Sequence, residues 1–265
     1  YPQRTELGIY LTNNSNANLN LNYTASDTNL FNFWYNNDTY SVANKSLGVL
    51  GTSFNITNLT WSEGNHNVTV WANDSAGNYN FASISFKIDS VNPSLSVLVP
   101  SVNNTNTTNT NQNVNFTFSD SFTQVAFAWY NNNTNSGANK SLGSGGTFFN
   151  ITNITWSEGN HNVTIYVNDT LGNLNYTSVS FTIDTTVPAV QFVSPTTATG
   201  NYSKGSIDAN VTASDSGSGL SGINISLYNS TGIYQSNFSA ISPLYINYTS
   251  LPDGTYRLNA TSNDT

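Results

Sequence analysis

The chain has 265 residues, no cysteine and no methionine, and it carries 6 Lys and Arg against 14 Asp and Glu, a formal net charge of -8. So few cations cannot form a basic stripe, which excludes a nucleic-acid partner, and no apolar run of 18 residues is present to insert into a membrane. Without cysteine there is no disulfide framework and no Cys-ligated metal.

Residues 1–91 are predicted to form a series of short amphipathic strands. Apolar side chains recur at every second position at Leu7, Ile9 and Leu11, again over residues 18–23, and again over residues 83–89. A period of two predicts half-buried β-strands, and turn-forming clusters such as residues 73–78 separate them. The 46 Asn, 35 Ser and 34 Thr disfavour long helices, and we find no helical periodicity.

The pattern of residues 1–91 returns in residues 92–186. The run 54–70 recurs almost letter for letter at 149–165, and the offset of 95 holds from Trp34/Trp129 to Pro93/Pro188. Residues 187–265 form a more diverged third copy. Three tandem units follow, each of them a two-sheet antiparallel sandwich of about seven strands. The third unit lacks a counterpart of the final strand, which ends the first unit at 83–89 and the second at 178–184.

Two stretches resemble a known class of repeats. Residues 68–78, VTVWANDSAGN, followed by residues 83–89 and Pro93, look like the last two strands of immunoglobulin-like repeats in bacterial and archaeal cell-surface and extracellular filament proteins. Residues 184–188, DTTVP, resemble the junction that joins such repeats head to tail. The resemblance implies three tandem immunoglobulin-like sandwiches outside the cell or on its surface, and it specifies no ligand.

Most acidic residues occupy positions that recur from unit to unit. Catalysis by paired carboxylates needs two carboxylates in different environments, so carboxylates repeated in every unit favour an architectural role, and we expect no enzyme activity. Eleven of the 14 fall at four such positions: Asp27/Asp120/Asp215, Asp74/Asp169/Asp264, Asp89/Asp184 and Glu63/Glu158/Asp253.

Asp89 and Asp184, at the two junctions, are the candidate metal ligands. Aspartates at sheet ends can gather oxygen ligands around a hard cation such as Ca²⁺, and the surface repeats that this chain resembles include some with calcium between domains. The alternative is structural, because no Asp-x-Asp-x-Asp run is present and an Asx-capped hairpin turn explains residues 73–78. No other cofactor is expected.

His66 and His161 are repeat mates, and Tyr256 takes their place in the third unit. A position that accepts either residue, at the start of a strand after a turn, resembles the tyrosine corner of sandwich folds. It predicts a packed, hydrogen-bonding side chain rather than a metal ligand or general base. We also expect Trp34 and Trp129, in equivalent strands, to be buried in the cores.

Asn-x-Ser/Thr sequons are about twice as frequent as independent placement would produce. The chain has 26, against about 12 expected from its 46 Asn and 69 Ser and Thr. Strand alternation also generates sequons, since residues i and i+2 share a face, but the excess favours dense N-glycosylation. The candidate sites are Asn13, Asn22, Asn37, Asn44, Asn58, Asn73, Asn132, Asn139, Asn153, Asn168, Asn201, Asn229, Asn237 and Asn247.

These features predict a structural, N-glycosylated extracellular protein, a subunit or segment of a cell-surface filament. Its partners would be copies of itself or further repeats of the same chain. Residues 5–11, with Leu7, Ile9 and Leu11, match the strand missing from the third unit and could be donated to a neighbouring copy. They match the first strand of the second unit equally well, so they can simply open the first unit.

The alternative function is an adhesive or carbohydrate-binding surface module. In that hypothesis Trp61/Trp156 and Tyr35/Tyr130 form aromatic platforms on which sugar rings stack. The third unit has Leu251 in the place of Trp61 and Trp156, which favours a core role for these tryptophans.

Overall fold

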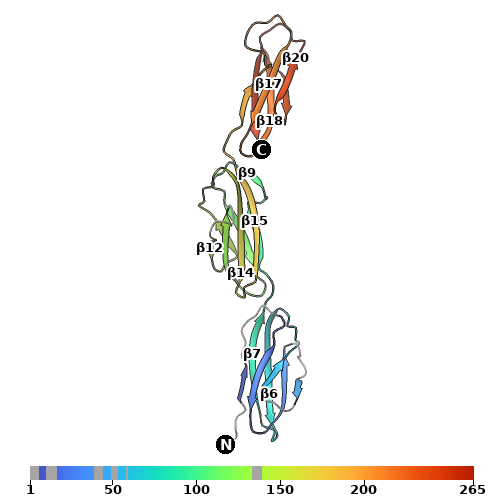
Figure 1. Cartoon of the computed structure of the whole chain (residues 1–265), viewed down its shortest axis with the longest axis vertical. Helices are drawn as coiled ribbons and strands as arrows, with labels where there is room; N and C mark the ends of the chain where they lie inside the picture. Colours follow the sequence, from blue (N-terminus) through green and yellow to red (C-terminus); the bar gives the residue numbers. More distant parts are fainter. Residues whose placement is uncertain (1–5, 10–16, 39–43, 49–52, 58, 133–138) are drawn as a thin grey trace.

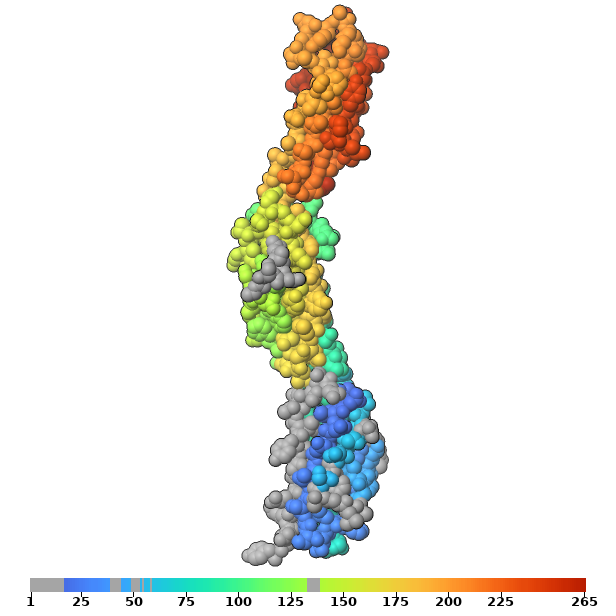
Figure 2. All heavy atoms as spheres, viewed as in Figure 1, coloured from blue at the N-terminus to red at the C-terminus, as the bar shows by residue number. Residues whose placement is uncertain are grey.

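The computed structural model describes residues 6–9, 17–38, 44–48, 53–57, 59–132 and 139–265. These residues form strands and no helix, which confirms the all-β prediction. Accordingly, none of them belongs to a helix long and apolar enough to cross a membrane. Figure 1 shows three groups of strands following one another along an elongated molecule, and Figure 2 shows the same outline in space-filling form.

The first sandwich packs a three-stranded sheet, in the order β1-β2-β5, against a four-stranded sheet in the order β4-β3-β6-β7. All its strand pairs are antiparallel. This is the two-sheet arrangement of an immunoglobulin-like fold. Its strands are β1 (Glu6–Ile9), β2 (Leu21–Ser26), β3 (Leu30–Asn37), β4 (Lys45–Gly48), β5 (Ser53–Ile56), β6 (Gly64–Asp74) and β7 (Tyr79–Ile88).

The second sandwich repeats this topology, and its described strands include one more, β9. Its sheets have the orders β13-β10-β8 and β12-β11-β14-β15-β9, and the short β9 lies parallel to β15 at the sheet edge. Its strands are β8 (Ser94–Val99), β9 (Thr105–Thr107), β10 (Val114–Ser119), β11 (Val125–Asn132), β12 (Lys140–Gly143), β13 (Phe148–Ile151), β14 (Gly159–Asp169) and β15 (Leu174–Ile183).

The third sandwich has two three-stranded sheets, in the orders β16-β17-β20 and β19-β18-β21. Among the described residues no strand takes the place beside β21 that β7 and β15 occupy in the other sandwiches. Its strands are β16 (Ala189–Phe192), β17 (Ile207–Ser214), β18 (Leu220–Asn229), β19 (Gly232–Ser239), β20 (Leu244–Tyr248) and β21 (Arg257–Asp264).

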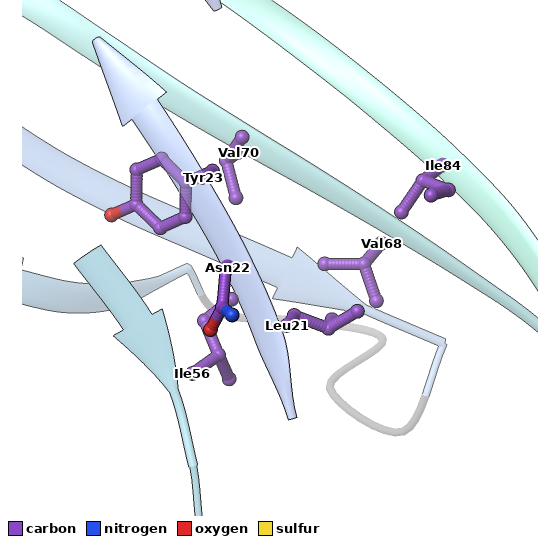
Figure 3. Close-up of a pocket in the computed structure, with 7 residues that line it drawn as sticks. All are labelled: Leu21, Asn22, Tyr23, Ile56, Val68, Val70 and Ile84. Atoms are coloured by element: carbon purple, nitrogen blue, oxygen red, sulfur yellow. The ribbon is translucent and has the colours of Figure 1, made fainter. Parts of the chain in front are cut away.

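Each sandwich has its own hydrophobic cluster, and each cluster falls within one of the predicted segments 1–91, 92–186 and 187–265. Figure 3 shows part of the first one, where Leu21, Tyr23 and Ile56 of one sheet lie opposite Val68 and Val70 of the other. The side chains leave no space there for a water molecule. Each hydrophobic cluster is confined to one sandwich. The hydrogen bonds between neighbouring sandwiches, such as Asn173 to Asp89 and Ser218 to Asp184, lie at the sandwich ends.

Strand β1 belongs to its own sandwich. It pairs with β2, with Glu6 opposite Ser26 and Ile9 opposite Tyr23, in the way that β8 pairs with β10 and β16 with β17. The described part of the candidate donor strand, which includes Leu7, therefore opens the first sandwich, as the alternative interpretation held. Leu11 lies outside the described residues.

The prediction that Trp34 and Trp129 are buried in the cores is wrong. In β3 the flanking Phe33 and Tyr35 are 0% and 5% exposed, so strand alternation directs Trp34 to the outer face, and β11 does the same with Trp129. Both tryptophans are half-buried because outer-face aromatic rings stack on them: the ring centroids of Trp34 and Trp71 are 6.3 Å apart. At the alternate positions the core is already filled by Phe33 and Tyr35 in β3 and by Ala128 and Tyr130 in β11.

Candidate metal centres at the two junctions

Three aspartates meet where the first sandwich passes into the second. Asp89 directly follows β7, Asp120 directly follows β10, and Asp169 is the last residue of β14. The end of β10 lies beside the start of β8, where the chain enters the second sandwich, because Ser119 pairs with Ser94. One ligand oxygen of each aspartate lies within 4.8 Å of the other two.

Hydrogen bonds hold these carboxylates in place from one side. Asp120 Oδ1 and Asp169 Oδ1 each accept two backbone N–H groups of their own turns, and Asp89 Oδ1 accepts the N–H of Val91. The amide Nδ2 of Asn173 donates to Asp169 Oδ2 at 2.7 Å and to the backbone carbonyl of Asp89 at 2.8 Å. The last bond ties the turn of one sandwich to the end of the other.

On the opposite side of the cluster, the described residues place no hydrogen-bond donor. Asp89 is 0% exposed and Asp169 is 1% exposed. The Oδ2 atoms of Asp89 and Asp120 are buried, and no group among the described residues donates to either. An unpaired buried polar atom costs about 1–3 kcal/mol, and more where it carries charge. The geometry therefore calls for a positive partner.

The second junction repeats the first, 95 residues later. Asp184 follows β15, Asp215 follows β17, Asp264 is the penultimate residue, and again one oxygen of each lies within 4.8 Å of the others. Asp184 is 4% exposed, and Asp215 Oδ2 is buried with no donor among the described residues. The two clusters are thus built from the same three repeat positions.

A loop of the third sandwich closes directly onto Asp184. Ser218 lowers the pKa of the Asp184 carboxyl to about 2, so this carboxylate is ionised at neutral pH. The Ser218 N–H donates to Asp184 Oδ2 at 2.6 Å. A Cβ at the neighbouring Gly217 would lie 2.3 Å from the same carboxylate, so glycine permits this approach.

The spacing of the three oxygens fits a divalent cation. Ca²⁺ binds six to eight oxygen ligands at about 2.3–2.6 Å, so ligands on opposite sides of the ion are about 4.8 Å apart. That is the limit within which each set of three lies. With no His or Cys in either set, Ca²⁺ or Mg²⁺ is favoured over Zn²⁺. The sequence predicts Asp89 and Asp184 as metal ligands. For Asp120, Asp169, Asp215 and Asp264 it predicts only an architectural role.

Two glutamates attach the linkers to the preceding sandwich. The carboxylate of Glu63 accepts the N–H of Ser90 at 2.9 Å and also its hydroxyl. The carboxylate of Glu158 accepts the N–H and the hydroxyl of Thr185, both at 2.9 Å. Ser90 and Thr185 directly follow the junction aspartates, so these glutamates fix the chain next to each cluster.

The histidine corner is confirmed. The Nε2 atoms of His66 and His161 lie 2.7 and 2.8 Å from the backbone carbonyl four residues earlier, and the hydroxyl of Tyr256 donates to the equivalent carbonyl at 2.8 Å. Both histidines are 3% exposed. Nε2 must carry the proton in this contact, since the carbonyl can only accept.

The aromatic platforms of the alternative hypothesis do not face solvent. Trp61 and Trp156 are each 4% exposed, and Tyr35 and Tyr130 are 5% and 7% exposed. The indole Nε1 atoms of the two tryptophans donate to backbone carbonyls inside the sandwiches, at 2.9 and 2.8 Å. These four residues are core side chains and cannot stack on a sugar.

The candidate sequons differ in exposure. Asn37 is 2% exposed, so its amide lies inside the sandwich and the structure argues against a glycan there. Asn13 and Asn58 lie outside the described residues. The exposed candidates are Asn22, Asn44, Asn139, Asn153, Asn201 and Asn247, and the half-buried ones are Asn73, Asn132, Asn168, Asn229 and Asn237.

No protein-family model matches the chain, and no curated protein matches it. Among solved structures it is similar to fibronectin(III)-like modules of Clostridium thermocellum CbhA, with 15% identity over 67% of this chain and 94% of that chain and a TM-score of 0.35. It is also similar to a tetra-tandem repeat from the extending region of a large adhesion protein, with 16% identity, 98% and 74% covered, and a TM-score of 0.37. A third is extracellular cadherin domains 3–6 of protocadherin gamma B2, with 17% identity, 82% and 56% covered, and a TM-score of 0.36. At these scores the superpositions carry no argument, and the fold rests on the sheets themselves.

Proposed function

We propose that the chain is a non-enzymatic, extracellular, N-glycosylated spacer, a subunit or segment of a surface filament, whose junctions are locked by a divalent cation. Its partners are further repeats of the same chain or further copies joined end to end. The observation that carries the proposal is the repetition of one aspartate triad at both junctions. Each triad takes one carboxylate from one sandwich and two from the next.

A cation at these positions would stiffen the molecule. It would pull the end of one sandwich onto two turns of the next, and so restrict the angle between their long axes. The glutamates that hold Ser90 and Thr185 support the same role, because they remove freedom from the linkers on the other side of each junction. Exposed sequons would add a hydrated surface that does not depend on charge.

Small-angle X-ray scattering of the full chain tests the proposal. In Ca²⁺ we expect a narrow distance distribution with one long maximum dimension, and in EDTA a broader distribution with a shorter average end-to-end distance. Scattering profiles that superpose in the two buffers would exclude cation-locked junctions.

A further inference from the structure

The outer face of the large sheet in the second sandwich carries a row of three aromatic side chains. Trp129 of β11, Tyr166 of β14 and Tyr176 of β15 are direct cross-strand neighbours. The rings of Trp129 and Tyr166 are nearly parallel, at 5° and 5.5 Å between centroids, and the ring of Tyr176 follows at 5.8 Å. Tyr176 is 64% exposed.

This aromatic row is open at the Tyr176 end. The only described strand beyond β15 is β9, and it pairs with residues 181–183, at the far end of β15 from Tyr176. No described strand therefore covers the edge beside Tyr176. An aromatic ring in this position offers an apolar face to a ligand, and its hydroxyl offers a hydrogen bond.

The same face continues into a polar hollow of about 820 Å³. Its rim includes the exposed side chains of Asn104, Asn106, Asn160 and Asn162, with Thr182 between them, and the hydroxyl of Thr182 donates to Asn160 Oδ1 at 2.6 Å. Small-molecule sites occupy about 300–1,000 Å³. Along β14, Tyr166 and Asn160 are six residues apart, which is roughly 20 Å of strand.

We propose that the aromatic row and the hollow together bind an extended neutral oligosaccharide carried by another molecule. The chemistry matches in three respects. Pyranose rings have apolar faces that stack on aromatic side chains, their hydroxyls pair with amide and hydroxyl groups, and a neutral sugar requires no charged partner. None of the side chains named in the row or on the rim is charged, in a chain whose net charge is -8.

The first sandwich provides an internal comparison. It has the same aromatic row, in which Trp34, Trp71 and Phe81 are cross-strand neighbours and Phe81 is 58% exposed. Lys87 stands there at the repeat position of Thr182, so a charged side chain replaces a neutral hydroxyl. The row is thus common to both sandwiches, and the neutral Thr182 in place of a lysine distinguishes the second.

The test uses the full chain made without glycosylation, so that no glycan on the sequon at Asn162 can occupy the face. Binding to an array of neutral glucose and mannose oligosaccharides is followed by calorimetry on the best ligand. Tyr176→Ala and Asn160→Ala change exposed side chains and should fold, and each should weaken binding at least tenfold. Phe81→Ala, the repeat mate of Tyr176, should change binding less than twofold.

Two results would overturn the proposal. One is the absence of binding to any neutral oligosaccharide at millimolar concentration. The other is an equal loss of binding in Phe81→Ala and Tyr176→Ala, which would assign the affinity to aromatic rows in general. Circular dichroism of each variant confirms that the sandwiches remain folded.

Discussion

Replacing Asp120 by Asn should raise stability more in EDTA than in calcium. At 4.8 Å, two ionised carboxylates repel by about 3.5 kcal/mol for an effective dielectric constant of about 20. Asp120 faces two such neighbours, Asp89 and Asp169. Asn keeps the oxygen that accepts the turn N–H groups and removes the charge, so in EDTA the variant should be more stable than the parent.

In calcium the advantage of the variant should shrink. A cation at 100 times its dissociation constant stabilises the parent by about 2.7 kcal/mol. In a unit of this size, each kcal/mol corresponds to a Tm shift of about 4–8 °C. Asp120→Asn should lose most of that gain at the first junction. Differential scanning calorimetry in calcium and in EDTA measures both differences.

The control for this experiment is the repeat mate Asp27. Its Oδ1 accepts the N–H of Asn29 in the same kind of turn, and the described residues place no pair of carboxylates around it. Asp27→Asn should therefore change Tm by the same small amount in both buffers. If Asp120→Asn also destabilised equally in EDTA and in calcium, the electrostatic reasoning would be refuted, and the aspartate would be only a turn cap.

Three further predictions concern the corner, one titrating group and the glycans. His161→Tyr should fold with nearly parental stability, because Tyr256 makes the same bond, whereas His161→Ala should lose roughly 2–3 kcal/mol in urea unfolding. The pKa of Asp208 is lowered chiefly by the hydroxyl of Tyr245, so Tyr245→Phe should raise it in an NMR titration. A carboxyl whose pKa is lowered by folding stabilises the fold at pH values above its unfolded pKa of about 3.9, and this stabilisation is lost as the pH falls through its folded pKa. Because the variant has the higher folded pKa, it should lose the stabilisation at a higher pH than the parent. Glycopeptide mapping should find glycans at exposed sites such as Asn139 and Asn201 and none at Asn37, which is 2% exposed.

Periodicity and repetition predicted the architecture because both are local properties of the chain. Alternation over residues 18–23 is enough to predict a strand where β2 begins. The ungapped offset of 95 residues then places β14 once β6 is known. The histidine corner was predictable for the same reason, since its bond reaches only four residues back. Alternation did not say which face of a strand is the inner one. In β3 both faces carry aromatic side chains, and the assumption that tryptophan faces the core chose the wrong one.

The aspartate triads were predictable in part only, because their members belong to two sandwiches. Asp89 is about 30 residues from Asp120 and 80 from Asp169 in the chain, and no local pattern relates them. The sequence did contain a signal: three acidic positions recurred at a common offset. Repetition was evidence against catalysis only, because catalysis by paired carboxylates needs two carboxylates in different environments. A metal site that joins repeats has to recur at every junction.

The triads also explain why the separate cores need not make a flexible string. A single sandwich has its own core and two of the three carboxylates, on turns that its backbone N–H groups already hold. The third carboxylate comes from the strand end of its neighbour, so the cluster exists only when two sandwiches are placed end to end. Without a cation, three ionised carboxylates would push that strand end away from the two turns, and a bound cation would reverse the sign of the force. The same residues would therefore make the junction a hinge without the cation and a rigid joint with it.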